Sequence, residues 1–223
     1  MPAEQQPSTM RELLRSLDVF SGDLPEFHPE AAPDTPQELF TAWLTEAVAA
    51  NVREPHAMTL STVGKDGTPT ARVLLLKDVG AGGWSFASHA ASPKGRDLAA
   101  APTAALTFYW PQQARQVRLC GTVAPESEER SAQDFLARSL GSRAEALVGM
   151  QSRPLDDPKS VLAATEESLA RLKREPDLVA EEWTLYTLSP NSVEFWQGDK
   201  QRKHIRLAYL RADDGWTTQL LWP

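Results

Sequence analysis

The clearest pattern in the chain is a short apolar run bounded by cations, Ala71 to Lys77, which reads Ala-Arg-Val-Leu-Leu-Leu-Lys. Turn-forming residues stand on both sides of it, 64–69 before and 80–83 after. An apolar run of this length between turns predicts a strand in the middle of a sheet, buried on both faces. Because side chains alternate along a strand, Arg72 and Lys77 are expected at opposite ends and on opposite faces. They either hold two parts of one anionic ligand or only solvate the strand ends.

Further short strands are predicted on both sides of this one. The stretch 115–123 alternates, with Gln116, Arg118 and Cys120 on one polar face, which either meets a ligand or belongs to a half-solvated edge strand. Cys120 is the only cysteine, so no internal disulfide forms, and we expect a buried, inert thiol. The remaining strand patterns cover residues 57–63, 84–88, 103–110, 183–188, 193–196, 207–211 and a last stretch that ends at Pro223.

Helix starts are marked by capping residues. Thr35-Pro36-Gln37-Glu38 is a capping box, and it predicts a helix with one apolar face made of Leu39, Phe40, Trp43, Leu44, Ala47 and Val48. Ser92-Pro93 opens another helix beside Lys94 and Arg96, which is either a phosphate site or an ordinary capped helix. Helices are also predicted over 127–139, 142–150 and 158–174, the last with an inward face of Val161, Leu162, Leu169 and Leu172.

Short strands dominate, and strands and helices do not alternate regularly. This order predicts an α+β fold that is mainly β, an antiparallel barrel or closed sheet with helices around it. Residues 1–33 hold one short helical pattern and three prolines after it, so we expect an N-terminal arm. Residues 34–223 are expected to form one domain.

The 223 residues carry a net charge of −7, which argues against general binding of nucleic acid through a basic surface. Positive charge gathers at 94–96, at 115–118 and at 200–206, and such local groups suit a small anion. No apolar run approaches the ~18 residues of a membrane span. Residues 1–6 show neither the basic nor the apolar part of a secretory signal, so a cytoplasmic protein is expected.

Several common sites are missing from the sequence. There is no glycine-rich dinucleotide or P-loop motif, and the four histidines lack the spacing of metal ligands, so no metal is expected. The loop from Arg202 to Arg206, with His204 in it, follows Trp196 closely. An aromatic ring beside a basic loop suits a planar anionic ligand, although a solvated hairpin has the same pattern.

Seven motifs occur in the order and with the spacings of one known family. They are Arg72-Val-Leu-Leu-Leu-Lys77, Ser92-Pro-Lys94-Gly, Phe108-Tyr-Trp110, Arg115-Gln116-Val117-Arg118, Gln151-Ser152, Glu194-Phe-Trp196-Gln-Gly198 and Arg202-x-His204-x-Arg206. By this set the chain resembles the pyridoxamine 5′-phosphate oxidases from about Thr35 to its C-terminal proline. The resemblance implies an FMN-binding split β-barrel, a homodimer with two FMN molecules at the interface. It also implies oxidation of pyridoxine or pyridoxamine 5′-phosphate to pyridoxal 5′-phosphate, with O₂ as acceptor and hydrogen peroxide as product.

The resemblance also assigns residues. For FMN it implies phosphate contacts from Arg72, Ser88 and Lys94, with Ala87 next to Ser88, and a flavin lining made of Val73, Leu74, Leu75, Leu76 and Lys77. It implies further flavin contacts, some across the dimer, from Gln116, Gln151, Ser152, Trp196 and Arg206. For the substrate it implies a phosphate clamp of Lys77, Arg138 and Ser142, and a pair, Arg202 and His204, that covers the ring and is the candidate catalytic pair. In an extended loop Arg202 and His204 would point the same way.

Four positions depart from the family pattern. Asp134 stands where a substrate-binding tyrosine is usual, Pro93 replaces an arginine, and Lys203 and Ile205 flank His204 in place of leucine and aspartate. These departures fall mostly on the substrate side, so two alternatives stay open. One is an oxidase of the same fold acting on another reduced planar ring, as in phenazine secondary metabolism. The other is a carrier of flavin or pyridoxal phosphate without turnover.

Overall fold

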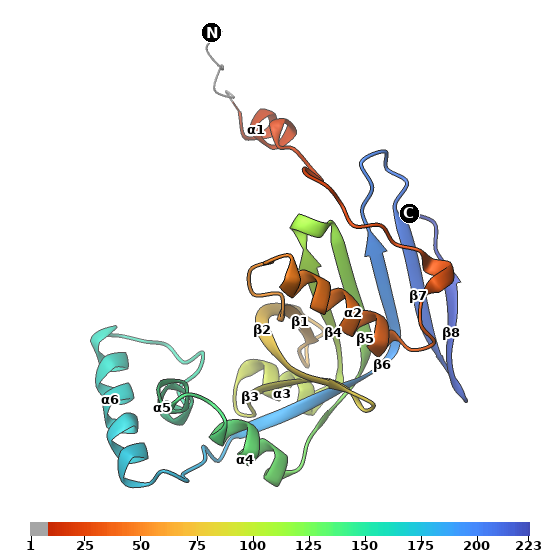
Figure 1. Ribbon diagram of the computed structural model, residues 1–223. Helices are drawn as coiled ribbons and strands as arrows, with labels where there is room; N and C mark the ends of the chain where they lie inside the picture. The colour runs from red at the N-terminus through yellow and green to blue at the C-terminus, as the bar shows by residue number, and fades with distance from the viewer. Residues whose placement is uncertain (1–8) are drawn as a thin grey trace.

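A computed structural model describes residues 9–223 (Figure 1). Residues 1–6, on which the expectation about a secretory signal rests, lie outside this range. The helices are α1 Met10–Ser16, α2 Pro36–Ala49, α3 Pro93–Ala100, α4 Glu128–Leu136, α5 Leu140–Val148 and α6 Lys159–Arg174. The strands are β1 Ala57–Val63, β2 Pro69–Gly80, β3 Gly83–His89, β4 Thr103–Trp110, β5 Arg115–Pro125, β6 Trp183–Gln197, β7 Ile205–Ala212 and β8 Gly215–Leu220. Within residues 9–223, no helix combines the length and apolar character needed to cross a bilayer.

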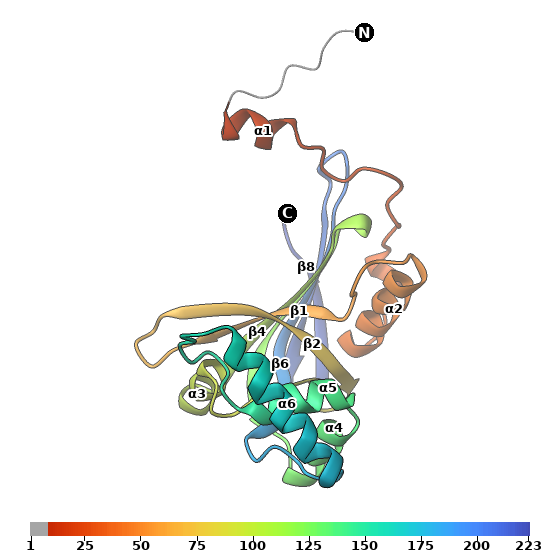
Figure 2. The ribbon, with the colours of Figure 1, turned by 90° about the vertical axis from the view of Figure 1, so that its left-hand side faces the viewer.

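The strands form one antiparallel sheet in the order β3-β2-β1-β4-β5-β6-β7-β8, and β3 also pairs with β6. This extra pairing closes six strands into a barrel, and β7 and β8 extend the sheet beyond it (Figures 1 and 2). The predicted fold class, a mainly β barrel of antiparallel strands with helices around it, is confirmed. Closure also removes two sheet edges that would otherwise expose unpaired backbone groups.

The two strands predicted over 183–188 and 193–196 are one strand, β6, and the expectation of two was wrong. Pro190 lies between the two predicted stretches, and proline cannot donate a ladder hydrogen bond. The pairing of β5 with β6 shifts register between Cys120 and Gly121, opposite this proline. A Cβ on Gly121 would lie 2.2 Å from the Ser189 carbonyl oxygen, so only glycine admits this close approach. The bulge lets the strand continue past the proline.

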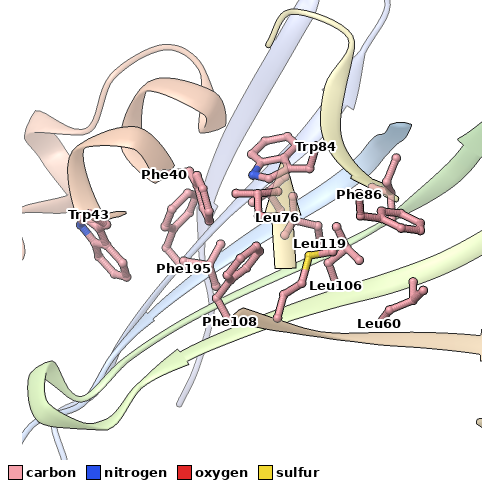
Figure 3. Packing of buried hydrophobic residues seen from close by; sticks show 14 of the residues in the cluster. Phe40, Trp43, Leu60, Leu76, Trp84, Phe86, Leu106, Phe108, Leu119 and Phe195 are labelled. Carbon is pink, nitrogen blue, oxygen red and sulfur yellow. The ribbon is translucent and has the colours of Figure 1, made fainter. Parts of the chain in front are cut away.

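Helix α2 packs its apolar face against the barrel (Figure 3). Phe40 contacts Trp84 and Phe108, with ring centroids 5.6 Å and 4.8 Å away, and Trp43 meets Phe195 edge to face at 5.2 Å. Thr35 caps the helix by accepting from the Glu38 N–H, as the sequence predicts. Val48 was expected on the same face, but it is exposed and lies outside the buried stripe, whereas its neighbour Ala47 is fully buried against the barrel.

Burial of both faces of β2 was also expected, and the structure corrects this. Leu74 and Leu76 point inward, whereas Val73 and Leu75 are 66% and 45% exposed on the outer face. Cys120, expected to be buried, is exposed on the outer face of β5. An apolar strand pattern does not distinguish a face covered by the same chain from a face left for a ligand or a second chain.

The predicted inward face of helix α6 is buried only in the second half of the helix. Leu172 is buried and Leu169 is partly buried, but Val161 and Leu162, expected to face inward, are exposed. At the N-terminus, α1 has no buried residue and stands away from the barrel (Figure 1). The later part of the segment is tied down, since Tyr209 Oη donates to the Pro33 carbonyl over 2.8 Å. The division into an arm at 1–33 and a domain at 34–223 stays a prediction.

Replacing Phe40 by alanine should lower the free energy of unfolding by about 3–5 kcal/mol, because it removes a fully buried ring and leaves a cavity. Val48→Ala on the same helix is the matched control, and an exposed position should cost about 0.5 kcal/mol or less. Urea unfolding followed by tryptophan fluorescence measures both. Equal losses for the two variants would contradict the assigned packing of α2.

Candidate functional site

A cavity of about 280 Å³ lies between β2, the start of α3 and the segment after α5. Residues that are far apart in the sequence converge on it: Arg72, Val73, Leu74, Pro93, Lys94, Gln151 and Ser152. Apart from Pro93, which was named as a departure from the family pattern, each of these residues was assigned to the cofactor by resemblance. The structure therefore places six of the predicted cofactor residues around one space.

The start of α3 positions Lys94. Ser92 caps the helix by accepting from the Gly95 N–H over 3.3 Å, and Pro93 takes the first helical position. A Cβ on Gly95 would lie 2.2 Å from the Ala90 carbonyl oxygen, so glycine lets the helix start close against the end of β3. This packing turns Lys94 into the structure, where its side chain is only 6% exposed.

The Lys94 ammonium is buried with neutral partners. Its Nζ donates to Gln151 Oε1 over 3.1 Å and to Ser92 Oγ over 3.3 Å, and no carboxylate of residues 9–223 forms an ion pair with it. Burial lowers the pKa of Lys94, and the nearby positive charge of Arg72 lowers it further. A buried cation of this kind is stabilised by an anionic ligand that brings its own acceptors.

Arg72 is held beside Lys94 by a network that the sequence analysis missed. Its guanidinium donates to Thr62 Oγ1 over 2.7 Å and to Thr70 Oγ1 over 2.6 Å. Both threonine hydroxyls also donate to Asp97 Oδ2. Burial lowers the pKa of Arg72, while the charge of Asp97 opposes this. Thr62 and Thr70 are cross-strand partners on the two sides of the turn-forming stretch 64–69, so the pairing register across that turn was a usable signal for them.

This cavity fits the phosphate of FMN. It offers two neighbouring cations, one of them without a counter-charge in the described chain, together with an amide and a hydroxyl side chain. Arg72, Lys94, Gln151 and Ser152 would hold the phosphate end, and the exposed outer face of β2 at Val73 and Leu75 would lie along the flavin. Ser88 is buried behind Ser92, with the two hydroxyl oxygens 3.4 Å apart. Leu76 is 9% exposed in the core, so its side chain does not line this face, and Ala87 does not line the cavity.

A second cluster contains most of the residues assigned to the substrate phosphate. Lys77 Nζ lies 3.4 Å from Asp134 Oδ1, and Trp183 Nε1 donates to Asp134 Oδ2 over 2.9 Å. The Arg138 guanidinium stacks on the Trp183 ring, 4.0 Å from its centroid. Ser142 lies in the first turn of α5, where its hydroxyl accepts from Ser139 Oγ over 2.9 Å. Trp183 was not expected in the site, and no sequence motif pointed to it.

A third cluster gathers at the far end of β6. Trp196 lies 5.1 Å from His204, measured between ring centroids, and cross-strand pairing places it between Gln116 and Arg206. Arg206 donates to Glu194 Oε1 over 2.8 Å and to the Trp222 carbonyl over 2.7 Å. The hydrogen bond to Glu194 raises the pKa of Arg206. Glu194 also accepts from Arg118, so one carboxylate pairs with two arginines. The sequence analysis missed this role of Glu194.

The loop before β7 is not extended. The expectation that Arg202 and His204 point the same way assumed an extended loop, so it does not hold here. Asp199 accepts from the backbone N–H groups of Gln201 and Lys203, which folds the loop into a turn. Arg202 consequently has a left-handed backbone with φ 63° and is exposed. His204 is oriented separately, since its Nδ1 accepts from the Asp199 N–H over 3.0 Å.

The basic pair at Arg115 and Arg118, expected to suit an anion, is divided between the two faces of β5. Arg115 is buried, where it bonds to Glu46 and Gln197 and its guanidinium lies 4.3 Å from the Trp43 ring centroid. Its charge is used to tie α2 to the barrel. Arg118 lies on the outer face and pairs with Glu194, so neither side chain is free for an anion.

The structure does not bring the three clusters together within one chain. Trp183 and Trp196 stand near opposite ends of β6, thirteen residues apart, which is roughly 40 Å at ~3.3 Å per residue. Gln116, Trp196 and Arg206 do not line the cavity at Lys94. The resemblance assigns some of these flavin contacts to a second copy of the chain.

Two protein-family models match the chain. The model described as pyridoxamine 5′-phosphate oxidase matches residues 44–171, and the model described as the pyridoxine 5′-phosphate oxidase C-terminal dimerisation region matches residues 183–223. The chain belongs to the pyridoxamine 5′-phosphate oxidase family. Pyridoxine/pyridoxamine 5′-phosphate oxidases are 43% identical in Burkholderia cenocepacia (197 residues, 87% of this chain and 91% of the relative) and 44% identical in Thermosynechococcus vestitus (195 residues, 86% and 90%).

Solved structures agree with the fold. PhzG from Burkholderia lata, in complex with tetrahydrophenazine-1-carboxylic acid, superposes with a TM-score of 0.84 at 30% identity, covering 91% of this chain and all of that one. An FMN-binding protein from Nostoc punctiforme, related to pyridoxamine 5′-phosphate oxidase, gives 0.70 at 19% identity, covering 88% of this chain and all of that one, and supports the fold alone. The predicted family and split barrel are confirmed.

Lys94→Met should raise the free energy of unfolding of the ligand-free protein at pH 7, because it removes a buried charge that lacks a counter-charge. Burial holds the Lys94 pKa below its usual 10.5, so between the folded and unfolded pKa the unfolded chain binds more protons and wild-type stability rises with pH. The difference in the free energy of unfolding between wild type and Lys94→Met should therefore become smaller as the pH approaches 10. Denaturant unfolding between pH 7 and 10 measures it.

Arg96→Met on the same helix is the control, since Arg96 is exposed and donates to the Ala91 carbonyl. It should show no such narrowing with pH. A Lys94→Met protein that is less stable than wild type at pH 7 would contradict the picture of an unpaired cation.

Proposed function

We propose that this protein is an FMN-dependent oxidase of a reduced, planar, anionic ring compound. The observation that carries the proposal is the cavity at Lys94, where a buried ammonium without a carboxylate partner lies beside the anchored guanidinium of Arg72. A structural role for such a pair would require a counter-charge, whereas a phosphate-bearing cofactor supplies one.

Bound FMN would supply the redox chemistry, accepting a hydride from the substrate and passing the electrons to O₂ with release of hydrogen peroxide. The chain's own residues bind and orient. Arg72 and Lys94 fix the phosphate, and the stiff strand β2 then sets where the ring system lies along Val73 and Leu75. Residues of the Trp196 cluster, which include His204 and Arg206, would cover the ring from a second copy of the chain. The aromatic face of Trp196 and the charge of Arg206 suit a flat anionic ligand.

A homodimer follows from this proposal. Its support is the match of residues 183–223 to a dimerisation region and the exposed apolar side chains of Val73 and Leu75 on the outer face of β2. The proposal places each active site between two chains, with the Lys94 cavity from one and the Trp196 cluster from the other.

The first substrate candidate is pyridoxine or pyridoxamine 5′-phosphate, oxidised to pyridoxal 5′-phosphate. The relatives with 43% and 44% identity bear the name of that activity. Lys77, Arg138 and Ser142 are present at the positions that the resemblance assigns to the substrate phosphate.

A second candidate is another reduced planar ring, and a specific observation favours it. Asp134 places a carboxylate against Lys77 of the expected phosphate clamp and against Trp183, the ring on which Arg138 of that clamp stacks. The structurally similar PhzG of Burkholderia lata is described in complex with a tetrahydrophenazine carboxylic acid, a ring compound without phosphate.

Purified protein should be yellow with bound FMN, and its flavin should bleach under anaerobic conditions when an oxidisable substrate is added. The panel comprises pyridoxamine 5′-phosphate, pyridoxine 5′-phosphate and a reduced phenazine carboxylate. Readmitting air should restore the colour and release one peroxide per turnover. A flavin-loaded protein that none of these compounds reduces would refute the oxidase and support the carrier.

Mixing two defective variants tests the shared site. Lys94→Met and Trp196→Ala should each lose most activity as pure dimers, because every site has one damaged half. Subunit exchange produces mixed dimers in which one site carries both defects and the other carries none. Random exchange should restore about a quarter of wild-type activity, since half the dimers then hold one intact site of two. Activity that stays at the level of the separate variants would contradict a site built from two chains.

A further inference from the structure

The Asp134 cluster is built as a partly satisfied anion site. Lys77 on β2 pairs with Asp134 Oδ1 at 3.4 Å, while Trp183 at the start of β6 donates to Asp134 Oδ2. The Asp134 side chain is 14% exposed and that of Lys77 is 33% exposed, so the pair is partly shielded from solvent. Both oxygens of the carboxylate are therefore engaged by neighbours that lie on two different strands.

Arg138 completes the cluster and keeps an unused donor. Its guanidinium is stacked on Trp183, and its Nη1 is buried without a hydrogen-bond partner among the described residues. Burial lowers the pKa of Arg138, and the charges of Asp134 and Glu145 oppose this. A buried N–H without an acceptor is unfavourable, and an acceptor on a ligand would relieve it.

The charge of the cluster restricts that ligand. Lys77 and Arg138 contribute two positive charges, Asp134 removes one, and the charge of Glu145 also acts on Arg138, so the group carries a net charge of at most about +1. An ionised carboxylate only accepts hydrogen bonds, so Asp134 cannot donate to a phosphate oxygen and repels a second anion. A phosphate at neutral pH brings three acceptor oxygens and nearly two negative charges. A carboxylate brings two acceptor oxygens and one negative charge. This matches the N–H of Arg138 that lacks a partner within residues 9–223 and the single positive charge that remains on the cluster.

We infer that Asp134 determines specificity by selecting substrates whose acidic group is a carboxylate rather than a phosphate. Asp134 pairs with the Lys77 ammonium, and its negative charge acts on Arg138, so both cations are weakened as partners for a phosphate dianion. This inference rests on the proposed function, because that proposal places the substrate at the Lys77 end of β2. It adds the class of acidic group that the substrate bears.

The test compares the binding of two planar ligands to the FMN-loaded protein, pyridoxal 5′-phosphate and phenazine-1-carboxylate, by perturbation of the flavin absorbance. Wild-type protein should bind the carboxylate more tightly than the phosphate. Asp134→Asn keeps the shape of the side chain and an acceptor for Trp183, but it removes the charge. It should strengthen binding of the phosphate at least tenfold more than binding of the carboxylate. Asp213→Asn removes the same charge from an exposed turn and should change neither affinity.

Each outcome decides the question. Wild-type protein that prefers the phosphate would overturn the inference, whatever the variant does. The same holds if Asp134→Asn changes both affinities by the same factor. Protein that takes up no FMN would refute the proposed function instead, so the two failures are distinguishable before either ligand is added.

Discussion

The structure depends on the pairing of one long strand, β6, with three others. Its first half pairs with β3 and closes the barrel, residues 186–197 pair with β5, and its second half pairs with β7. Because the strand continues through the bulge at Gly121, it fixes Trp183 near one end and Trp196 near the other. These two indoles mark the two clusters that the proposed function assigns to the substrate and to the ring system. The strand that closes the barrel therefore also keeps the Trp183 and Trp196 clusters apart, and this distance is why the proposal needs a second chain.

The cavity at Lys94 follows from a different constraint, the tight turn from β3 into α3. Glycine at position 95 and the Ser92 cap allow the helix to begin against the barrel wall, and this geometry directs the ammonium inward. The cost of burying that charge is not offset by any carboxylate pair in the described chain. Arg72, in contrast, is fixed through two threonines to Asp97, so the two cations differ in their freedom to meet a ligand. A prearranged guanidinium and an unpaired ammonium together suit a dianionic phosphate.

Sequence reasoning predicted most of the scaffold because its signals are local. The Thr35 cap, the Ser92-Pro93 helix start and the turn-forming stretch 64–69 all depend on neighbouring residues. It failed where burial depends on what covers a second face, as at Val73, Leu75 and Cys120. The single strand through Pro190 was predicted as two, because the bulge that accommodates this proline requires the distant Gly121. Among site residues, Arg72 and Lys94 were candidates from local patterns and were assigned to the cofactor phosphate through the resemblance. Thr62, Asp97 and Trp183 act through partners distant in sequence, which no motif records.

The central claim is that the chain holds a flavin by its phosphate, and calorimetric titration of the flavin-free protein with FMN and with riboflavin tests it most directly. Two cations that bond to the phosphate, each contributing about 1.5–3 kcal/mol, predict that FMN binds at least ~100-fold more tightly than riboflavin. Equal affinity for the two flavins would contradict the account, because the cavity at Arg72 and Lys94 would then have no part in holding the cofactor.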